Sequence, residues 1–372
     1  MKIAIDVRSL MEGRHSGVEE YTVQIIRALI RVAPQHSYHL FYNSYKDVRL
    51  PDFGKGRVIT HGFRFPNKIF NVWQLVTGHP HWDNLIDQHV DVIFVPSVRL
   101  TPLSADVPLV AVMHDLSYER FPEFLNAWRR VWHRMMRPRL MMENADHVIS
   151  DSEHTKQDLI HLYKLPEAKI SVVYPGAPTL PVPRAADIHA VRRRYVLPDK
   201  FVLSFGSIEP RKNVASIIRA WSAIASRVPH DLVIAGDKGW RQNEIEKVIQ
   251  SSSFKKRIHQ IGFVAEEEKL AVYAAADLFV YPSFYEGFGF PPLESLLAGT
   301  PVITSFNSAL PEVVGKWATL IDPYNPSQLA AVMQEMLQRP ERVLAETKKE
   351  ISRIFSWDGA ARQIVRILEK AS

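Results

Sequence analysis

The chain has 372 residues, of which 46% are apolar and 23% charged, as in a globular protein long enough for two domains. It contains no cysteine, which excludes disulfide bonds, cysteine metal sites and a thiol nucleophile and is typical of a reducing compartment. The net charge of +6 predicts acidic partners such as phosphates, anionic lipid or nucleic acid, without choosing among them. We find no signal-peptide pattern and no run of about 20 apolar residues, and we therefore expect a cytoplasmic protein.

The first half of the chain alternates short apolar segments with helical patterns. The segments are rich in β-branched residues and apolar throughout, as in parallel strands that are covered on both faces. Helices are predicted at residues 18–32, 127–144 and 153–163. Strands are predicted at residues 2–7, 38–42, 91–96, 109–114, 147–150 and 170–174. This alternation predicts an α/β fold with a parallel sheet.

A proline-rich segment, residues 175–183 (PGAPTLPVP), interrupts the alternation and indicates an extended linker. Beyond it, strands are predicted at residues 201–205, 232–235, 259–263, 278–281, 302–304 and 318–321. Helices are predicted at residues 214–226, 243–251, 266–275, 292–298, 326–337 and, amphipathic, 357–371. Two doubly wound, Rossmann-like domains are the simplest architecture, with ligands expected in a cleft between them, beyond the carboxyl ends of the strands.

The most informative stretch is residues 281–300, YPSFYEGFGFPPLESLLAGT. A strand runs into a loop of glycines and aromatics, and two prolines then begin a helix that Gly299 ends. Such a helix start attracts anions. Two carboxylates, Glu286 and Glu294, lie eight positions apart around the loop. Glu294 is either a favourable partner of the helix dipole or a bidentate partner for the two hydroxyls of a ribose.

A second loop, residues 206–213 (GSIEPRKN), follows the strand predicted at 201–205. Arg211 and Lys212 precede a helix that Asn213 can cap. Two cations at a strand end and a helix start are typical of a diphosphate site, since Arg offers a planar fork and Lys a point charge. The alternative is a solvated basic turn.

Two weaker candidates lie in the first half of the chain. Gly17 precedes the first helix and either allows close approach of a phosphate or is a plain turn glycine. His114 ends an apolar strand and either faces a ligand or has a structural role. Asp115 either orients the imidazole of His114 or caps the next turn.

The sequence that carries these residues resembles the retaining glycosyltransferases of family 4, which have the GT-B fold. Glu286 and Glu294 match the E-x7-E signature of that family, and residues 206–213 resemble its diphosphate-binding loop. Residues 16–22 (SGVEEYT) resemble its N-terminal glycine loop. Residues 147–159 (HVISDSEHTKQDL) and 170–177 (ISVVYPGA) resemble the end of its first domain. The resemblance is colinear over most of the chain.

The resemblance implies two domains, residues 1–180 on the acceptor side and residues 181–356 for the nucleotide sugar, with the helix at 357–372 packing back on the first. It also implies that Arg211 and Lys212 neutralise the leaving diphosphate, which Gly17 approaches from the first domain. Ser207 stands where many members carry Arg, and Arg211 is the candidate to supply that charge.

The other implied roles concern the sugar and the nucleoside. Glu286 and the backbone of Gly287, Phe288 and Gly289 would hold the sugar hydroxyls, His114 would reach the sugar, Glu294 would bind the ribose, and Val264 would lie near the base. Glu286, His114, Lys212 and Arg211 are thus the candidate catalytic residues. No Asp-x-Asp motif lies near the donor loops, so we expect neither a divalent metal nor a cofactor.

The reaction that these roles predict breaks a glycosyl–phosphate bond, with negative charge developing on the diphosphate. Double displacement uses two carboxylates near the sugar, as acid and nucleophile. Here only Glu286 is expected there. The sequence therefore predicts front-face attack by the acceptor, with a donor phosphate oxygen as the base.

Residues 127–142, AWRRVWHRMMRPRLMM, contain five arginines and two tryptophans and no acid. Such a helix either lies on an anionic membrane surface or is an ordinary helix with solvated arginines. Residues 63–73 (FRFPNKIFNVW) are also basic and aromatic and could line an acceptor groove. Together they raise the hypothesis of a lipid-linked saccharide acceptor at the inner membrane face.

The prediction is a retaining, metal-independent hexosyltransferase in polysaccharide or lipopolysaccharide (O-antigen) synthesis. GDP-mannose is the first candidate donor, on the resemblance of the PRKN loop alone, and UDP- or dTDP-sugars are the alternatives. A sugar-nucleotide epimerase or a phosphorylase shares the fold. A basic nucleic-acid-binding protein is the non-enzymatic alternative, but it would leave Glu286 and Glu294 unexplained.

Overall fold

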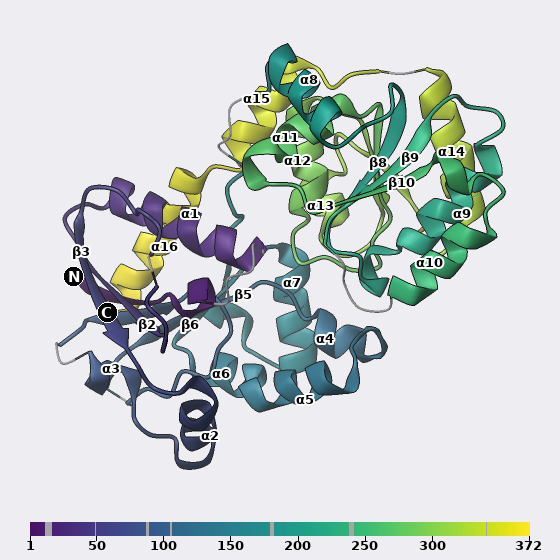
Figure 1. Cartoon of the computed structure of the whole chain (residues 1–372). Helices are drawn as coiled ribbons and strands as arrows, with labels where there is room; N and C mark the ends of the chain where they lie inside the picture. Colours follow the sequence, from purple (N-terminus) through teal and green to yellow (C-terminus); the bar gives the residue numbers. More distant parts are fainter. Residues whose placement is uncertain are drawn as a thin grey trace. The chain divides into compact units, whose positions relative to one another are not determined.

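The computed structural model describes residues 1–11, 17–48, 50–86, 89–104, 106–178, 182–237, 242–339 and 341–372. The chain divides into two compact units (Figure 1). Unit 1 comprises Met1–Gly176 and Phe355–Ser372, and unit 2 comprises Ala177–Ile354. The boundary at Gly176 falls within the proline-rich segment.

Unit 1 is built on a seven-stranded sheet in the order β3-β2-β1-β4-β5-β6-β7, with every described pair parallel. The strands are β1 (Lys2–Asp6), β2 (Ser37–Asn43), β3 (Arg57–Phe63), β4 (Val92–Val95), β5 (Leu109–Met113), β6 (His147–Ser150) and β7 (Ile170–Val172). The chain leaves β1 first in one direction and then in the other, so the sheet is doubly wound. Strands β4 and β5 are buried along their whole length, which explains their unbroken apolar sequence.

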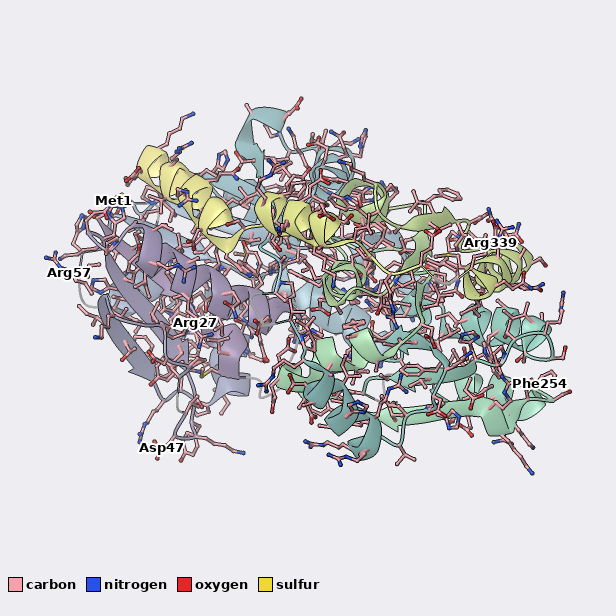
Figure 2. The ribbon with its side chains drawn as sticks, turned by 90° about the horizontal axis from the view of Figure 1, so that it is seen from above. Met1, Arg27, Asp47, Arg57, Phe254 and Arg339 are labelled. Atoms are coloured by element: carbon pink, nitrogen blue, oxygen red, sulfur yellow. The ribbon has the colours of Figure 1, made fainter. Side chains whose placement is uncertain are left out.

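Helices cover both faces of the unit 1 sheet. They are α1 (Gly17–Val32), α2 (Asn67–Thr77), α3 (Trp82–Leu85), α4 (Ser117–Arg120), α5 (Ala127–Met136), α6 (Pro138–Asn144), α7 (Glu153–Asp158) and α16 (Trp357–Ala371). The C-terminal helix α16 lies beside α1, as Figure 2 shows for the yellow and purple helices. Arg31 of α1 pairs with Asp358 of α16, and the rings of Tyr21 and Trp357 meet edge to face at 5.7 Å. The last residues of the chain are therefore part of the first unit.

Unit 2 contains a six-stranded sheet in the order β10-β9-β8-β11-β12-β13, also parallel in every described pair. Its strands are β8 (Phe201–Phe205), β9 (Asp231–Ala235), β10 (Ile258–Gly262), β11 (Leu278–Tyr281), β12 (Val302–Ser305) and β13 (Thr319–Ile321). Its α-helices are α8 (Ala185–Arg194), α9 (Val214–Ile224), α10 (Gln242–Ser251), α11 (Glu266–Ala275), α12 (Phe290–Ala298), α13 (Leu310–Val314), α14 (Pro326–Gln338) and α15 (Ala345–Ile354). Figure 1 shows α9, α10 and α14 on one side of this sheet and α8, α11 and α12 on the other.

All six strands predicted for the second half are present, but the first half holds a strand that the prediction missed. Strand β3 lies at the edge of the sheet, and most of its residues are at least partly exposed. Its sequence, RVITHGF, therefore lacks the continuous apolar run that marks a buried strand.

The single helix predicted at residues 127–144 is wrong, because the structure has two helices there. Arg137 adopts a left-handed conformation with φ of 47°, and Pro138 begins α6. Proline has no N–H for a continuing helix and disfavours the helical conformation in the residue before it, so the chain turns at this point. Helix α5 is consequently a short, separate element.

Among the described residues, none of the helices combines the length and the apolar character needed to span a bilayer. Unit 1 nevertheless carries exposed apolar side chains on helices α2 and α5.

Candidate active site

The two loops with the strongest sequence signals meet at the centre of the unit 2 sheet. Strands β8 and β11 are parallel neighbours, so both of their loops leave the same edge of the sheet. The chain order reverses between these strands, which makes this the topological switch point where α/β sheets bind ligands. The loops are joined through the Arg211 carbonyl, which accepts from the Phe284 N–H at 2.9 Å and lies 3.0 Å from the Ser283 hydroxyl oxygen.

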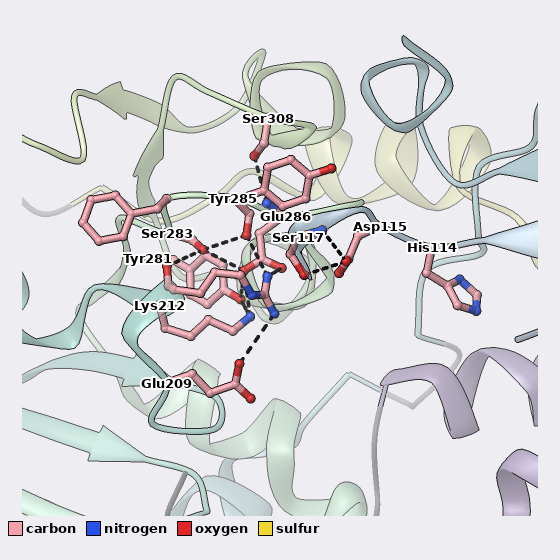
Figure 3. Close-up of polar contacts among 12 residues, drawn as sticks. His114, Asp115, Ser117, Glu209, Lys212, Tyr281, Ser283, Tyr285, Glu286 and Ser308 are labelled. Carbon is pink, nitrogen blue, oxygen red and sulfur yellow. Dashed lines mark hydrogen bonds and ion pairs between the residues drawn. The ribbon is translucent and has the colours of Figure 1, made fainter. Parts of the chain in front are cut away.

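The carboxylate of Glu286 is the centre of this site (Figure 3). Its Oε1 accepts hydrogen bonds from Lys212 Nζ at 2.7 Å, Tyr281 Oη at 2.8 Å and Ser283 Oγ at 2.8 Å. Its Oε2 lies 2.7 Å from Nη1 of Arg211. Only 7% of the residue is exposed. Both carboxylate oxygens are thus engaged by donors of the same unit.

This environment keeps Glu286 ionised. Burial by itself would raise the pKa of the carboxyl group, but the charges of Arg211 and Lys212 outweigh it and lower the pKa to about 2. Burial lowers the pKa of Lys212, and its contact with Glu286 opposes that effect. A carboxylate held by two cations and two hydroxyls is a poor proton donor at neutral pH.

The two cations are held in different ways. Lys212 donates to Tyr281 as well as to Glu286, and its ammonium lies 4.7 Å from the centre of the Tyr281 ring. Arg211 donates to the Tyr285 carbonyl at 2.7 Å and lies 4.0 Å from Glu209. Both belong to a short 3-10 helix, Pro210–Lys212, which fixes the backbone that carries them.

Ser207 and Asn213 have roles that the sequence did not predict. Ser207 donates to Glu209 at 2.9 Å, so Glu209 lies between Ser207 and Arg211. The predicted cap by Asn213 is wrong: this residue precedes α9 in a left-handed conformation and makes no side-chain capping bond. Its amide donates instead to the carbonyls of Pro282, at 3.2 Å, and Pro323, at 2.8 Å, so it ties the two loops to a third.

The glycine-rich turn after Glu286 is shaped by Gly289, which has φ of 105°. A Cβ at Gly289 would lie 2.7 Å from a methyl group of Leu310, so the position excludes side chains. Phe288 is buried beneath the turn. Helix α12 begins at Phe290, earlier than predicted, and Gly299 ends it in a left-handed conformation as predicted.

Glu294 occupies a separate cluster. It lies on α12, is 3% exposed, and accepts a hydrogen bond from Lys269 of α11 at 2.7 Å. Burial raises the pKa of Glu294, whereas the charges of Glu294 and Glu266 outweigh burial at Lys269 and raise its pKa to about 12. The dipole interpretation of Glu294 is therefore incomplete, because the residue has a dedicated cationic partner.

Val264 lies in the loop between β10 and α11, and its side chain is buried. Any contact of this position with a ligand would therefore involve its backbone. The neighbouring Phe263 is exposed.

The two remaining candidates belong to unit 1. His114 follows β5, and its Nδ1 lies 2.6 Å from the Asp151 carboxylate while its Nε2 lies 2.8 Å from the Pro96 carbonyl. Both ring nitrogens thus face oxygen atoms, an arrangement that favours the protonated imidazole. Burial by itself would lower the pKa of His114, but the charge and hydrogen bond of Asp151 raise it. Asp115 does not orient the ring; it accepts from the N–H and hydroxyl of Ser117 and caps that turn (Figure 3).

Gly17 is the first residue of α1 and is exposed. A Cβ there would meet nothing within 4 Å, so neighbouring atoms do not require glycine at this position. Ser16, the residue before it, lies outside the described part of the chain.

The structure adds residues that the sequence analysis did not select. Asp151 follows β6, the neighbour of β5, so the rule that ligands and polar groups gather at strand ends could have found it. Tyr281 and Ser283 lie inside the selected stretch but carried no signal of their own. No sequence motif marked Lys269 either, because only the packing of α11 on α12 brings it to Glu294. Within the described ranges there is no group of three or more His, Asp or Glu side chains that could hold a metal ion.

Comparison with known proteins identifies the family. Residues 15–179 match the family described as Glycosyltransferase Family 4, and residues 189–353 match the family described as Glycosyl transferases group 1. The chain is a family 4 glycosyltransferase. The two matches together span nearly the whole sequence.

Relatives of this glycosyltransferase include mannosyltransferases. It is 29% identical over 267 residues to O-antigen chain mannosyltransferase B of Escherichia coli, an alignment that covers 69% of this chain and 68% of that protein. It is 28% identical over 233 residues to the serotype-specific mannosyltransferase WbdA of the same organism, covering 59% of this chain but only 28% of WbdA.

Solved structures share the fold over the full length. Anabaena HepE in complex with UDP-glucose superposes with a TM-score of 0.72 and 19% identity, covering 100% of both chains. Sucrose-phosphate synthase from Thermosynechococcus elongatus gives a TM-score of 0.73 at 20% identity, over 100% of this chain and 98% of that one. The fold is GT-B, with two parallel sheets covered by helices.

Proposed function

We propose that this glycosyltransferase transfers a hexose, with retention of configuration, from a nucleotide-diphosphate sugar that unit 2 binds. The observation that carries the proposal is the cluster of Arg211, Lys212 and Glu286 at the switch point between β8 and β11. These three groups sum to one positive charge, and two of them are cations that a diphosphate can bridge.

In this proposal Arg211 and Lys212 stabilise the charge that develops on the departing diphosphate. Glu286, fixed by four donors, orients the sugar through its hydroxyls, together with the backbone of the turn Gly287–Phe288–Gly289. Glu294, paired with Lys269, accepts from the ribose, and the backbone at Val264 lies near the base. Gly17 and His114 of unit 1 are proposed to complete the donor site.

Front-face attack by the acceptor fits the state of Glu286. A carboxylate whose pKa is about 2 and whose oxygens are all hydrogen-bonded is neither the acid nor a strong nucleophile that double displacement needs. We therefore propose that a phosphate oxygen of the donor takes the acceptor proton. Trapping of a covalent glycosyl adduct on Glu286 would contradict this mechanism.

GDP-mannose is the proposed donor, and its support is that two relatives are named as mannosyltransferases. A UDP-sugar is the second candidate, because the structural neighbour HepE was crystallised with UDP-glucose. The proposed acceptor is a saccharide or lipid-linked saccharide in polysaccharide synthesis at the cytoplasmic face of a membrane, in keeping with the relative named for the O-antigen chain.

A thermal-shift screen of GDP, UDP and dTDP and of their sugars tests the proposal. The nucleotide that binds the folded state raises the unfolding temperature by mass action. We expect GDP and GDP-mannose to stabilise the protein and Lys212→Ala to abolish the shift. Selective stabilisation by UDP would replace GDP in the proposal, and no stabilisation by any nucleotide would reject it.

A further inference from the structure

Helix α2 of unit 1 presents apolar side chains to solvent. Phe70 and Gln74 point into the unit and are buried, whereas Ile69, Trp73 and Val76 on the other side are 68%, 58% and 78% exposed. The exposed residues recur at the spacing of one helical face. A surface helix normally carries polar residues on its solvent-facing side, whereas the solvent-facing side of α2 is apolar.

Helix α5 of the same unit has a second face of this kind. Trp128 is 73% exposed, and Val131 and Trp132, one turn further on, are exposed as well. Arg130 and Arg134 are exposed on the same short helix. Neither residues 63–78 nor residues 125–142 contain an acidic residue. The two helices thus expose apolar groups in segments whose charges are all positive.

Both helices lie on the same side of the unit. Figure 1 shows both at the lower edge of unit 1. Phe70 of α2 and Met141 of α6, the helix that follows α5, belong to one apolar core, so the two segments are anchored in the same body.

We propose that these exposed faces of α2 and α5, called here the α2–α5 surface, bind an anionic lipid bilayer. Tryptophan side chains are suited to the boundary between headgroups and acyl chains, and arginines are attracted to anionic headgroups. The proposal does not depend on the identity of the donor or on the chemistry of unit 2.

A second copy of the chain is a poorer occupant of the surface. Pairing of α5 with itself would bring the arginines of two copies together, with no carboxylate in residues 125–142 to neutralise them. Like charges that meet across an interface are costly. An anionic bilayer supplies the missing negative charge and also takes up the apolar groups.

Sedimentation with vesicles tests the proposal on the full chain. The vesicles are two parts phosphatidylcholine to one part phosphatidylglycerol, and phosphatidylcholine alone is the neutral comparison. We expect binding to the anionic vesicles that decreases with salt. Trp73→Ser with Val76→Ser, and separately Trp128→Ser with Val131→Ser, should each lower the partition coefficient about tenfold or more. Arg130→Glu should weaken binding by a similar factor.

Matched controls come from unit 2. Val196→Ser with Leu344→Ser removes two exposed apolar residues, and Arg193→Glu makes the same charge change as Arg130→Glu. We expect these variants to bind as the wild type does, and unchanged thermal unfolding without vesicles shows that every variant is folded.

Three results would overturn the proposal. One is a wild-type chain that does not sediment with anionic vesicles, and another is an equal loss of binding in the unit 2 controls, which would indicate attraction to the net charge alone. The third is a wild-type dimer, measured by sedimentation velocity, that the α2 or α5 variants convert to a monomer.

Discussion

The ammonium group of Lys269 lies 2.7 Å from Oε1 of Glu294, on neighbouring helices α11 and α12. The ion pair is largely buried, and it opposes the effect of burial on the Glu294 carboxyl group, whose pKa is nevertheless raised. A carboxylate that binds a ribose must be ionised to accept both hydroxyl hydrogens. We therefore regard Lys269 as a positioning residue for the proposed nucleotide site.

Lys269→Met should raise the pKa of Glu294 further and weaken nucleotide binding about tenfold, the effect of losing one hydrogen bond to a charged group. Binding should recover as the pH rises, because Glu294 then ionises without its partner. Calorimetric titration at several pH values measures both effects, with Lys269→Arg as the conservative control. An unchanged preference for the ribonucleotide over its 2′-deoxy analogue would contradict the role of Lys269.

Lys212→Ala removes a largely buried cation from the proposed diphosphate site. We expect kcat to fall about 10²- to 10³-fold, as when a preorganised donor to a developing negative charge is removed. Steady-state kinetics with the nucleotide sugar identified in the screen measures the loss. Lys200→Ala, at an exposed lysine of the same unit, is the control and should leave kcat unchanged. Near-normal turnover of Lys212→Ala would refute the assigned role.

The pKa of Glu286 predicts how stability depends on pH. Its folded value of about 2 lies below the ordinary 4.5, so ionised Glu286 stabilises the native state above the ordinary value. This contribution to the free energy of unfolding, about 3 kcal/mol, is lost as the pH falls through the folded-state pKa of Glu286. Urea unfolding from neutral pH towards about pH 3 should show the decline. The decline should be shallower in Glu286→Gln. It should be unchanged in Glu335→Gln, which removes an exposed carboxylate of the same unit. An equal slope in all three proteins would exclude Glu286 as the cause of the decline.

The contact between His114 and Asp151 predicts the opposite sign. Because Asp151 raises the pKa of His114 above its ordinary 6.5, protonated His114 stabilises the fold at low pH and the contribution disappears as the pH rises through the folded value. NMR titration of the ring, assigned by comparison with His114→Gln, measures the pKa. Asp151→Asn should lower it below the ordinary value. A His114 pKa that does not respond to Asp151→Asn would show that the carboxylate is not its cause.

Gly289 and Gly299 provide a matched pair for the turn and the end of α12. Both have positive φ, 105° and 97°, so alanine is strained at either position. At Gly289 the new Cβ would press on Leu310 in the interior, whereas at Gly299 it would meet the end of the flexible Lys348 side chain. Gly289→Ala should therefore lower the free energy of unfolding by about 1–3 kcal/mol and by more than Gly299→Ala does. Equal losses, measured by urea unfolding, would contradict the importance of the Leu310 contact.

Local patterns in the sequence predicted most of the secondary structure. Buried parallel strands such as β4, β5 and β11 are apolar throughout, so their composition alone revealed them. Strand β3 escaped because an exposed edge strand has no such composition, and the break at Pro138 was missed because the apolar and basic pattern continues across it.

The sequence by itself determined the family, the α/β class and the stretches that carry Arg211, Lys212, Glu286 and Glu294, because each is a short motif of special residues. Only the tertiary structure decided what these residues touch. Glu286 meets Arg211 and Lys212 because β11 pairs with β8, Glu294 meets Lys269 because α11 packs on α12, and His114 meets Asp151 because β5 pairs with β6. The order of neighbouring residues in the sequence determines the structure of a single strand or turn. Partners that lie 25 to 75 residues apart are brought together by strand order and helix packing.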